Sequence, residues 1–326
     1  MLALAAPGVA CAPQRDPPGP ALAPPVLGQE SFTAADGRIL ATVRHDARAP
    51  RAVVVAAHGF NDYSNAFHLV GPWLAERSIS VVAVDQRGFG DTPTRGLWAG
   101  ADAMAGDLAA LTRAVRDDDP DLPVYLLGAS MGAAVAVLAV ADHGAPADGM
   151  ILSGPAFWGW SAMNPVYRAS LWTAAHTVPA WRLTGEGLGR RPSDNDEMLR
   201  ALSRDPKVIR ATRVDTIYGL VTLMEAASAA APRVHVPTLV LFGARDEIVP
   251  EAPAREAARR LGGPVRYVRY ADGWHMLLRD TGRETVYADV AAWLADPQGP
   301  LPSGEELALS PESGHDLSAR AGRASQ

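Results

Sequence analysis

One serine of this chain lies in a sequence context that can make it a nucleophile. Ser130 is the central residue of Gly128-Ala-Ser-Met-Gly132, which follows a short apolar run and precedes an alanine- and valine-rich helical pattern. A strand, a sharp turn and a helix in this order form a nucleophile elbow, with the serine at the apex of the turn. Larger residues at positions 128 and 132 would collide with the neighbouring strand and helix, so glycine is expected there. Ser161 lacks this context, and we interpret it as a loop serine.

An activated serine needs a histidine base, and that histidine needs a carboxylate to orient it. After a nucleophile elbow, the expected chain order is serine, then aspartate or glutamate, then histidine, each in a loop that follows a strand. The apolar run 238–242 leads into Asp246, and the run 265–270 leads into His275. These positions predict a triad of Ser130, His275 and Asp246.

Other acidic and histidine residues compete for these roles. Glu247 is the alternative carboxylate, although the position in the turn favours Asp246. Asp272 precedes Gly273 and is expected to shape the turn before the histidine. The remaining histidines without a strand-end context are interpreted as ordinary side chains: His143, His176, His235 and His315.

The tetrahedral intermediate of acyl transfer carries an oxyanion, which needs two preorganised N–H donors. The first predicted donor is the backbone N–H of Met131, directly after the nucleophile at the start of a helix. The second is the backbone N–H of Phe60, in the loop that follows the first buried strand. In this interpretation His58 and Gly59 shape the loop, and His58 takes no part in proton transfer.

Short β-branched runs alternate with helical patterns along most of the chain. This alternation predicts a mostly parallel sheet with helices on both faces, which is an α/β fold. Apolar positions alternate on both sides of Asp36-Gly37, which predicts an antiparallel hairpin within residues 26–44. The buried strands are expected at 51–57, 79–84, 150–153, 238–242 and 265–270, in addition to the strand before Ser130.

These patterns divide the chain into a core and three additional segments. Residues 26–154 and 233–298 are predicted to form one discontinuous α/β core. Residues 155–232 have a helical pattern and four of the eight tryptophans, and they are expected to cover the carboxyl edge of the sheet, where α/β proteins bind ligands. Residues 299–326 are polar and are expected to form a disordered tail.

The amino-terminal residues 1–25 combine a small apolar stretch, Cys11 and a proline-rich stretch. This arrangement resembles the end of a bacterial lipoprotein signal, in which the cysteine is lipidated, although it lacks a positively charged start. A disordered extension or a misplaced start codon is the alternative. The sequence leaves both open, and with them a cytoplasmic or a membrane-anchored location.

Composition excludes several classes of partner. A net charge of −6 argues against nucleic acid and against an anionic membrane surface as an electrostatic partner of the whole chain. Cys11 is the single cysteine, which excludes an intramolecular disulfide and a cysteine metal cage.

Taken together, the motifs resemble the α/β-hydrolase superfamily, and within it the monoacylglycerol lipase and lysophospholipase branch, also called serine aminopeptidase-like. The resemblance extends from about residue 30 to residue 296. In this family the positions of Ser130, Asp246 and His275 form the triad, and those of Phe60 and Met131 form the oxyanion hole. The segments that carry it are His58-Gly-Phe, Asp85-Gln-Arg-Gly-Phe-Gly, Gly128-Ala-Ser-Met-Gly, Gly243-Ala-Arg-Asp and Trp274-His-Met-Leu-Leu.

The resemblance implies an esterase that acts on single-chain acyl lipids without a metal or a cofactor. The sequence leaves open a peripheral contact with a membrane, through the helical insertion or a lipidated Cys11. Asn61-Asp-Tyr63 departs from the loop expected for eukaryotic monoglyceride enzymes, which leaves the acyl substrate open. The alternatives are a small-ester carboxylesterase, a thioesterase, a proline-type aminopeptidase and a non-catalytic binding protein. An aminopeptidase would need acidic groups for the substrate amine, and Asp194, Asp196 and Glu197 are the candidates.

Overall fold

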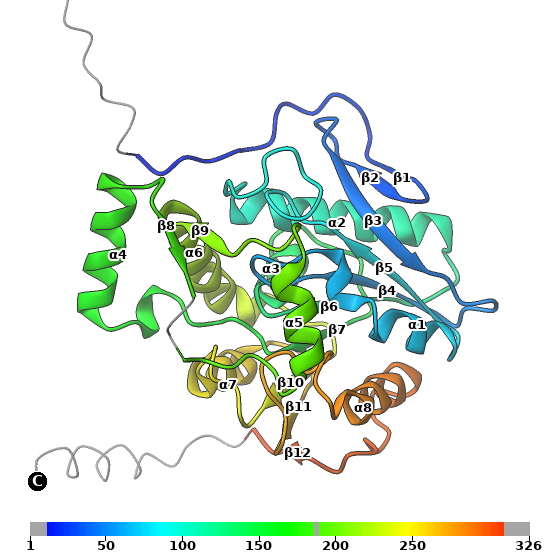
Figure 1. Cartoon of the computed structure of the whole chain (residues 1–326). Helices are drawn as coiled ribbons and strands as arrows, with labels where there is room; N and C mark the ends of the chain where they lie inside the picture. Colours follow the sequence, from blue (N-terminus) through cyan, green and yellow to red (C-terminus); the bar gives the residue numbers. More distant parts are fainter. Residues whose placement is uncertain (1–11, 186–188, 310–326) are drawn as a thin grey trace, which may run out of the picture.

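The structure is a computed structural model that describes residues 12–185 and 189–309 (Figure 1). Cys11 and residues 310–326 lie outside the described residues. A ten-stranded sheet forms the centre of the molecule, with the strand order β1-β2-β3-β5-β4-β6-β7-β10-β11-β12. This architecture confirms the predicted α/β fold.

The six central strands of this sheet run parallel to one another. Their β-branched and leucine residues are buried on both faces, because helices cover the sheet on either side. They are β4 (Ala52–Ala57), β5 (Ile79–Val84), β6 (Val124–Ala129), β7 (Gly149–Ser153), β10 (Thr238–Gly243) and β11 (Val265–Tyr270).

Antiparallel strands close the sheet at both edges. At one edge, β2 (Ser31–Thr33) and β3 (Ile39–His45) form the predicted hairpin, with Phe32 opposite Leu40. The two-residue strand β1 (Val26–Leu27) pairs with β2. At the other edge, β12 (Glu306–Leu307) pairs with β11.

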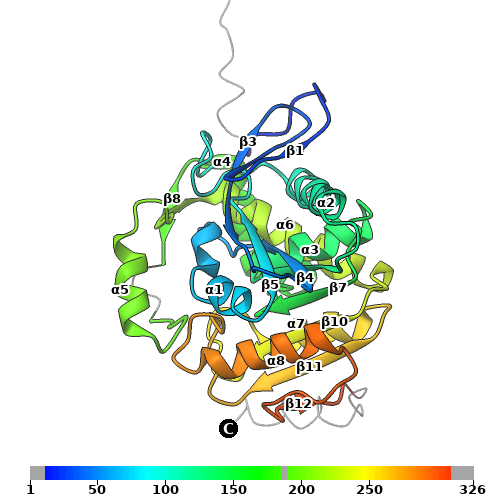
Figure 2. The ribbon, with the colours of Figure 1, turned by 90° about the vertical axis from the view of Figure 1, so that its right-hand side faces the viewer.

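Helices cover the two faces of the sheet and bury one apolar cluster on each (Figure 2). One face carries α2 (Ala101–Asp118), α3 (Met131–Ala141) and α7 (Glu251–Arg260). The opposite face carries η1 (Ser64–Phe67), α1 (Val70–Ala75) and α8 (Arg283–Ala295).

Residues 155–232 differ from the purely helical pattern expected for them. They form α4, α5 and α6 together with a two-stranded antiparallel sheet of β8 and β9, whose β8 residues are all exposed. The end of α6 belongs to the main core, because Leu223 and Ala227 pack in the same cluster as α3. The elements are η2 (Trp160–Ala162), α4 (Pro165–Thr177), β8 (Arg182–Thr184), α5 (Asp196–Arg204), β9 (Ala211–Arg213), α6 (Val214–Ala230) and, directly after them, η3 (Ala231–Arg233).

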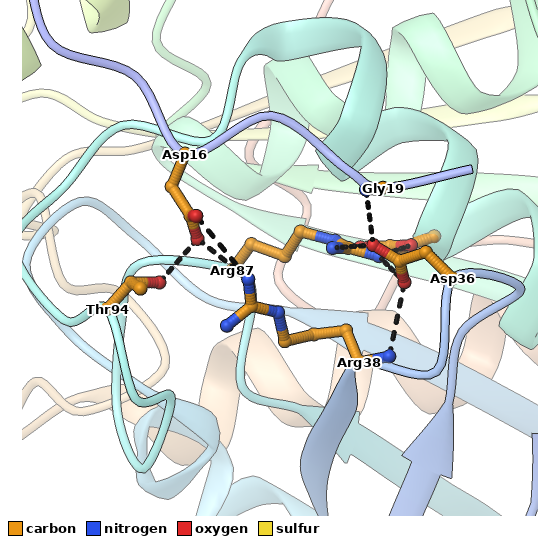
Figure 3. Close-up of polar contacts among 7 residues, drawn as sticks. Asp16, Gly19, Asp36, Arg38, Arg87 and Thr94 are labelled. Atoms are coloured by element: carbon orange, nitrogen blue, oxygen red, sulfur yellow. Dashed lines mark hydrogen bonds and ion pairs between the residues drawn. The ribbon is translucent and has the colours of Figure 1, made fainter. Parts of the chain in front are cut away.

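Residues 12–25, for which a disordered extension was one of the alternatives, make defined contacts with the rest of the chain. Asp16 pairs with Arg38 and accepts a hydrogen bond from Thr94 (Figure 3). Gly19 donates to Asp36, whose carboxylate also forms a buried ion pair with Arg87. These contacts attach the stretch to the β2–β3 hairpin and to the loop after β5.

The same stretch also contacts the insertion. The Gln14 N–H donates to Asp215 at 3.0 Å, and the Gln14 side chain accepts from Arg213 at 2.9 Å. Residues 12–25 therefore connect the β2–β3 hairpin with the junction of β9 and α6.

The tail was expected to be disordered from residue 299, and this is wrong for residues 299–309. Leu301 is buried in the cluster beneath α8, and Glu306 forms an ion pair with Arg266 of β11. One buried leucine and a pair of complementary charges order this segment despite its polar composition.

Candidate active site

The loops after three parallel strands bring Ser130, His275 and Asp246 together. Ser130 follows β6, Asp246 follows β10 and His275 follows β11. His275 Nε2 lies 3.0 Å from Ser130 Oγ, and His275 Nδ1 lies 2.7 Å from Asp246 Oδ2. The Asp246 side chain is fully buried and that of His275 is 8% exposed. The three side chains therefore form a continuous hydrogen-bonded chain that ends at a hydroxyl group.

The backbone at Ser130 has the strained conformation of a nucleophile elbow. Its φ of +52° and ψ of −114° lie outside the favoured regions for a residue with a side chain. The turn is tight enough to require Gly132, because a Cβ there would lie 2.0 Å from the carbonyl oxygen of Ala57. The Ser130 N–H donates to the carbonyl of Ser153 at 2.9 Å, which attaches the turn to β7.

Two backbone N–H groups fix the orientation of the Asp246 carboxylate. Its Oδ1 accepts from Ile248 at 2.7 Å and from Val249 at 2.9 Å, which leaves Oδ2 for His275. Glu247, the alternative carboxylate, is exposed and accepts from the backbone N–H of Arg191 in the insertion. The structure thus brings Asp246 to the histidine and points Glu247 elsewhere.

The loop after β4 lies beside the serine. A Cβ on Gly59 would lie 3.3 Å from Ser130 Cβ, and Phe60 lines the same cavity as Ser130. Met131 is the first residue of α3, so its N–H has no acceptor within the helix. Within residues 12–185 and 189–309, neither the Phe60 N–H nor the Met131 N–H donates a hydrogen bond.

His58 is fully buried and supports this loop. Burial lowers the pKa of His58, so the neutral ring predominates. Its Nδ1 lies 2.8 Å from the carbonyl of Gly59, and its Nε2 accepts from the backbone N–H of Gln86 at 3.0 Å. The proton is therefore on Nδ1, and the ring joins the loop after β4 to the loop after β5.

A cavity of about 420 Å³ extends from the serine between the core and the insertion. Ser130 and His275 lie in its wall, and most of the remaining wall is apolar. A ligand in this space would exchange water for apolar contacts at one end and reach the hydroxyl at the other. The larger apolar side chains that the insertion contributes to the lining include Trp158, Met163, Leu171, Ile217, Leu220 and Met224.

The four tryptophans of the insertion lie in different surroundings. Of the four tryptophans in the insertion, Trp158 lies in the cavity wall. Trp160 packs against Tyr218 of α6, whereas Trp172 and Trp181 are exposed on the outer side of the insertion. The lining is mainly aliphatic because residues of α6 supply much of it.

The structure also reveals charged residues near the serine that the sequence patterns missed. Asp62 and Arg279 form a buried ion pair in the cavity wall, although 217 positions separate them. Asp280 accepts from the backbone N–H of Trp274 at 2.8 Å and from the Ser193 hydroxyl at 2.6 Å. Burial raises the pKa of Asp280. The local signal for these residues is an Arg-Asp pair that directly follows an apolar run after His275.

The acids considered for an aminopeptidase have other partners. Asp194 accepts hydrogen bonds from the Thr281 backbone and hydroxyl, and these bonds lower the pKa of Asp194 against the effect of burial. Asp196 pairs with Arg191, and Glu197 lines a separate cavity. None of the three lies in the wall of the cavity at Ser130.

The described residues contain no group of three or more His, Cys, Asp and Glu side chains placed to bind a metal ion. No helix among them is both long enough and apolar enough to cross a membrane.

Comparison with known proteins places the chain among hydrolases. Monoacylglycerol lipase of Mycolicibacterium smegmatis is 27% identical over 273 residues, which cover 82% of this chain and 96% of the relative. Human monoglyceride lipase is 25% identical over 260 residues, which cover 76% of this chain and 83% of that protein.

Solved structures show the same fold. A soluble variant of monoglyceride lipase from Saccharomyces cerevisiae, in complex with a substrate analogue, matches with a TM-score of 0.69 and 20% identity, over 82% of this chain and 95% of that one. A carboxyl esterase from Bacillus coagulans, in complex with glycerol, matches with a TM-score of 0.66 and 23% identity, over 81% of this chain and 96% of that one.

A match to a family model identifies the family of the chain. The model for serine aminopeptidase, S33, matches residues 48–282, which include the loop after β4 and the loops that carry Ser130, Asp246 and His275. This match agrees with the relatives and with the α/β-hydrolase fold. The chain therefore belongs to the serine aminopeptidase S33 family of α/β-hydrolases and is a serine ester hydrolase.

Proposed function

We propose that this protein hydrolyses the carboxylic ester of a monoacylglycerol through an acyl-enzyme on Ser130. The observation that carries the proposal is the Ser130–His275–Asp246 chain of hydrogen bonds, which ends in the wall of a largely apolar cavity. The similarity to the monoacylglycerol lipase of Mycolicibacterium smegmatis over 96% of that protein supports the choice of substrate.

In the proposed acylation step, His275 Nε2 removes the proton of Ser130 as Oγ attacks the ester carbonyl. Asp246 keeps the proton of the imidazole on Nδ1 and stabilises the imidazolium that forms. The N–H groups of Phe60 and Met131 donate to the oxyanion, and loss of one such donor typically lowers kcat on the order of a hundredfold or more.

The leaving alcohol then takes the proton from His275, which leaves the acyl group on Ser130. In the deacylation step, His275 removes a proton from water, and the resulting attack on the acyl-enzyme releases the fatty acid and restores the serine. Each step uses side chains and backbone groups of this chain alone.

We also propose that residues 155–232 act as a cap that binds the acyl chain. The apolar side chains of this segment that line the cavity would replace water around a hydrocarbon chain and gain roughly 25 cal/mol for each Å² of apolar surface removed from water. The buried Asp62–Arg279 pair offers hydrogen bonds to a polar headgroup in the same cavity.

The outer side of the cap supports a further part of this proposal, a peripheral contact with a membrane. Helix α4 has a single buried residue, Ala175. Tryptophan and tyrosine favour the boundary between water and lipid, where one end of the side chain is apolar and the other polar. We call the exposed apolar side chains on and after α4 the outer cap face; they are Val166, Tyr167, Trp172, Val178, Trp181 and Leu183.

The chemistry is tested by Ser130→Ala, with Ser161→Ala as the matched control. Ser161 is a second serine near the cavity, but its hydroxyl donates to Glu225 and has no histidine partner. We expect Ser130→Ala to abolish ester hydrolysis and fluorophosphonate labelling while the protein stays folded by circular dichroism. Ser161→Ala is expected to keep normal activity. More than trace turnover in Ser130→Ala would overturn the assignment of the nucleophile.

The substrate is tested by fatty-acid release from 1-monoacylglycerols, lysophosphatidylcholine, triacylglycerol and p-nitrophenyl acetate. We expect the highest kcat/KM with a monoacylglycerol, because the cavity wall is largely apolar and the chain is similar to a monoacylglycerol lipase over 96% of that relative. Faster release from lysophosphatidylcholine would move the assignment to a lysophospholipase. A preference for the acetyl ester would favour a small-ester carboxylesterase and overturn the lipid part of the proposal.

A further inference from the structure

Three arginines line one open cavity of about 310 Å³ on the surface, away from the serine. Arg95 comes from the loop after β5, Arg182 from β8, and Arg210 from the loop that leads into β9. All three side chains belong to exposed residues. The rest of the lining consists of Gly96, Val208, Ile209 and Ala211, so no acidic side chain of the described residues lines this space.

The side chains of these three arginines have neutral hydrogen-bond partners. Their hydrogen bonds go to backbone carbonyls: Arg95 to Gly90 at 3.3 Å, Arg182 to Ala211 at 3.0 Å, and Arg210 to Ser203 at 2.6 Å. Within the described parts of the chain, none of them forms an ion pair with a carboxylate. A guanidinium has five N–H donors, so most of their donors remain available to a ligand.

Two other cationic side chains nearby do have carboxylate partners, so the excess of positive charge is confined to the three arginines. Lys207 pairs with Asp91, and Arg213, which lies opposite Arg182 in the β8–β9 ladder, pairs with Asp215. Three uncompensated positive charges around one cavity are unexpected in a chain with a net charge of −6. The net charge argues against an anionic membrane surface as a partner of the whole chain, but it does not describe this cavity, where positive charge is in excess.

The arginine cavity adjoins the outer cap face. Arg182 is flanked in the sequence by Trp181, which is 62% exposed, and by Leu183, which is 41% exposed; because neighbouring residues of a strand project to opposite faces, Leu183 lies on the face of β8 opposite to Arg182. Helix α4 lies beside β8 at the periphery of the molecule (Figure 1). Apolar side chains that can enter a bilayer and guanidinium groups that can contact its headgroups therefore occur at the same end of the cap.

We propose that the cavity formed by Arg95, Arg182 and Arg210 binds the phosphate groups of anionic phospholipids. The planar guanidinium matches the oxygens of a phosphate and binds them with paired hydrogen bonds. Arginines near an anionic membrane strengthen binding by about fivefold each, so three of them strengthen it by about a hundredfold. The inference rests on the proposed membrane contact and adds to it the class of lipid that the cap recognises.

The adjacent apolar face points to a lipid as the source of the phosphate. A soluble phosphate compound would use the arginines alone, and the exposed Trp181 and Leu183 would remain in water. A phospholipid surface satisfies both groups at once, because its headgroups meet the arginines and its acyl region receives the aromatic and aliphatic side chains.

The test is flotation of the full chain with vesicles of phosphatidylcholine, either pure or mixed with phosphatidylglycerol. The test variant is the triple substitution Arg95→Gln, Arg182→Gln and Arg210→Gln. The control is Arg51→Gln, an exposed arginine just before β4, at the amino end of the parallel strands. Both variants keep every residue of the proposed active site, so hydrolysis of a soluble p-nitrophenyl ester should be unchanged.

We expect the unmodified protein and the Arg51→Gln control to bind the anionic vesicles about a hundredfold more tightly than the neutral ones. The triple variant should bind both kinds of vesicle alike. A triple variant that keeps the anionic preference, or an unmodified protein that has none, would overturn the inference. Displacement from anionic vesicles by inorganic phosphate, beyond the effect of chloride at equal ionic strength, would identify a soluble phosphate site and equally overturn it.

Failure of the membrane contact has a different signature. If the unmodified protein binds neither kind of vesicle while it hydrolyses the soluble ester, both the membrane contact and the lipid site are wrong, and the esterase assignment stands. If it binds both kinds equally, the contact stands and only the arginine site is wrong.

Discussion

Replacement of Asp246 by asparagine tests the proposed triad most directly. Asp246 Oδ1 accepts from the N–H groups of Ile248 and Val249 at 2.7 and 2.9 Å, and an asparagine oxygen can keep both bonds. The amide NH₂ then takes the place of Oδ2, 2.7 Å from His275 Nδ1. Two donors cannot share that bond, so His275 must present a lone pair at Nδ1 and bear its proton on Nε2. The histidine can then no longer accept the proton of Ser130.

The magnitude follows from this change of tautomer. In a serine triad such a substitution lowers kcat by about 10⁴-fold, which corresponds to about 5.4 kcal/mol of transition-state stabilisation. Stability should change little, because the two backbone bonds persist and the amide donates to the histidine. The assay is kcat on a soluble p-nitrophenyl ester, with thermal unfolding measured on the same preparations.

Glu247→Gln is the matched control, since Glu247 is the neighbouring carboxylate and contacts the backbone of Arg191. We expect its kcat to remain within about twofold of the unmodified protein, because the residue does not contact His275. The reasoning is refuted if Glu247→Gln loses more activity than Asp246→Asn. It is also refuted if a folded Asp246→Asn variant keeps a tenth or more of the original kcat.

Three further predictions concern stability. Gly132→Ala should lower the free energy of unfolding, measured in urea, by about 1–3 kcal/mol, because the alanine Cβ would lie 2.0 Å from the Ala57 oxygen. The control Gly282→Ala, at a position with open space around it, should have little effect. The hydrogen bond from Arg87 holds the pKa of Asp36 well below its ordinary value. The ionised Asp36 therefore stabilises the folded protein fully above about pH 3.9, and this stabilisation is lost as the pH falls below that. Urea unfolding between pH 7 and pH 2 should therefore show a smaller acid-dependent loss for Asp36→Asn than for the unmodified protein, and equal losses would contradict this. Leu301→Ala should lower the free energy of unfolding by about 2 kcal/mol or more in the same assay, because Leu301 is buried, and Leu307→Ala, at an exposed position, should lower it much less. Similar small losses for the two variants would contradict an ordered segment at 299–309.

Short-range sequence signals identified the central fold and the proposed triad. The parallel strands are continuous β-branched or leucine-rich runs, and burial on both faces leaves little choice of residue there. The glycines around Ser130 follow from a turn that admits no Cβ, and Asp246 and His275 follow from their positions after strands. Each of these signals depends on residues within a few positions of one another.

Contacts between segments that are far apart in the sequence could not be predicted from short-range sequence patterns. Residues 12–25 and 299–309 are held by ion pairs with arginines in other parts of the fold, Arg38 and Arg266, and the second segment also by the burial of its own Leu301. The three-residue strand β8 is exposed along its length, so it has no apolar pattern, and its pairing with β9 is visible only in the folded chain.

Around Ser130, too, some features were predictable from the sequence and others are visible only in the folded chain. The amino-acid sequence indicated the groups that we propose to exchange protons, because nucleophile, base and carboxylate each need a particular residue type at the end of a strand. The tertiary structure alone decided that Asp62 meets Arg279 in the cavity wall and that three arginines converge beside the outer cap face. A charge on the surface of a single segment is ordinary in any soluble chain, and it becomes a site only when folding brings other segments, with or without a compensating charge, to the same place.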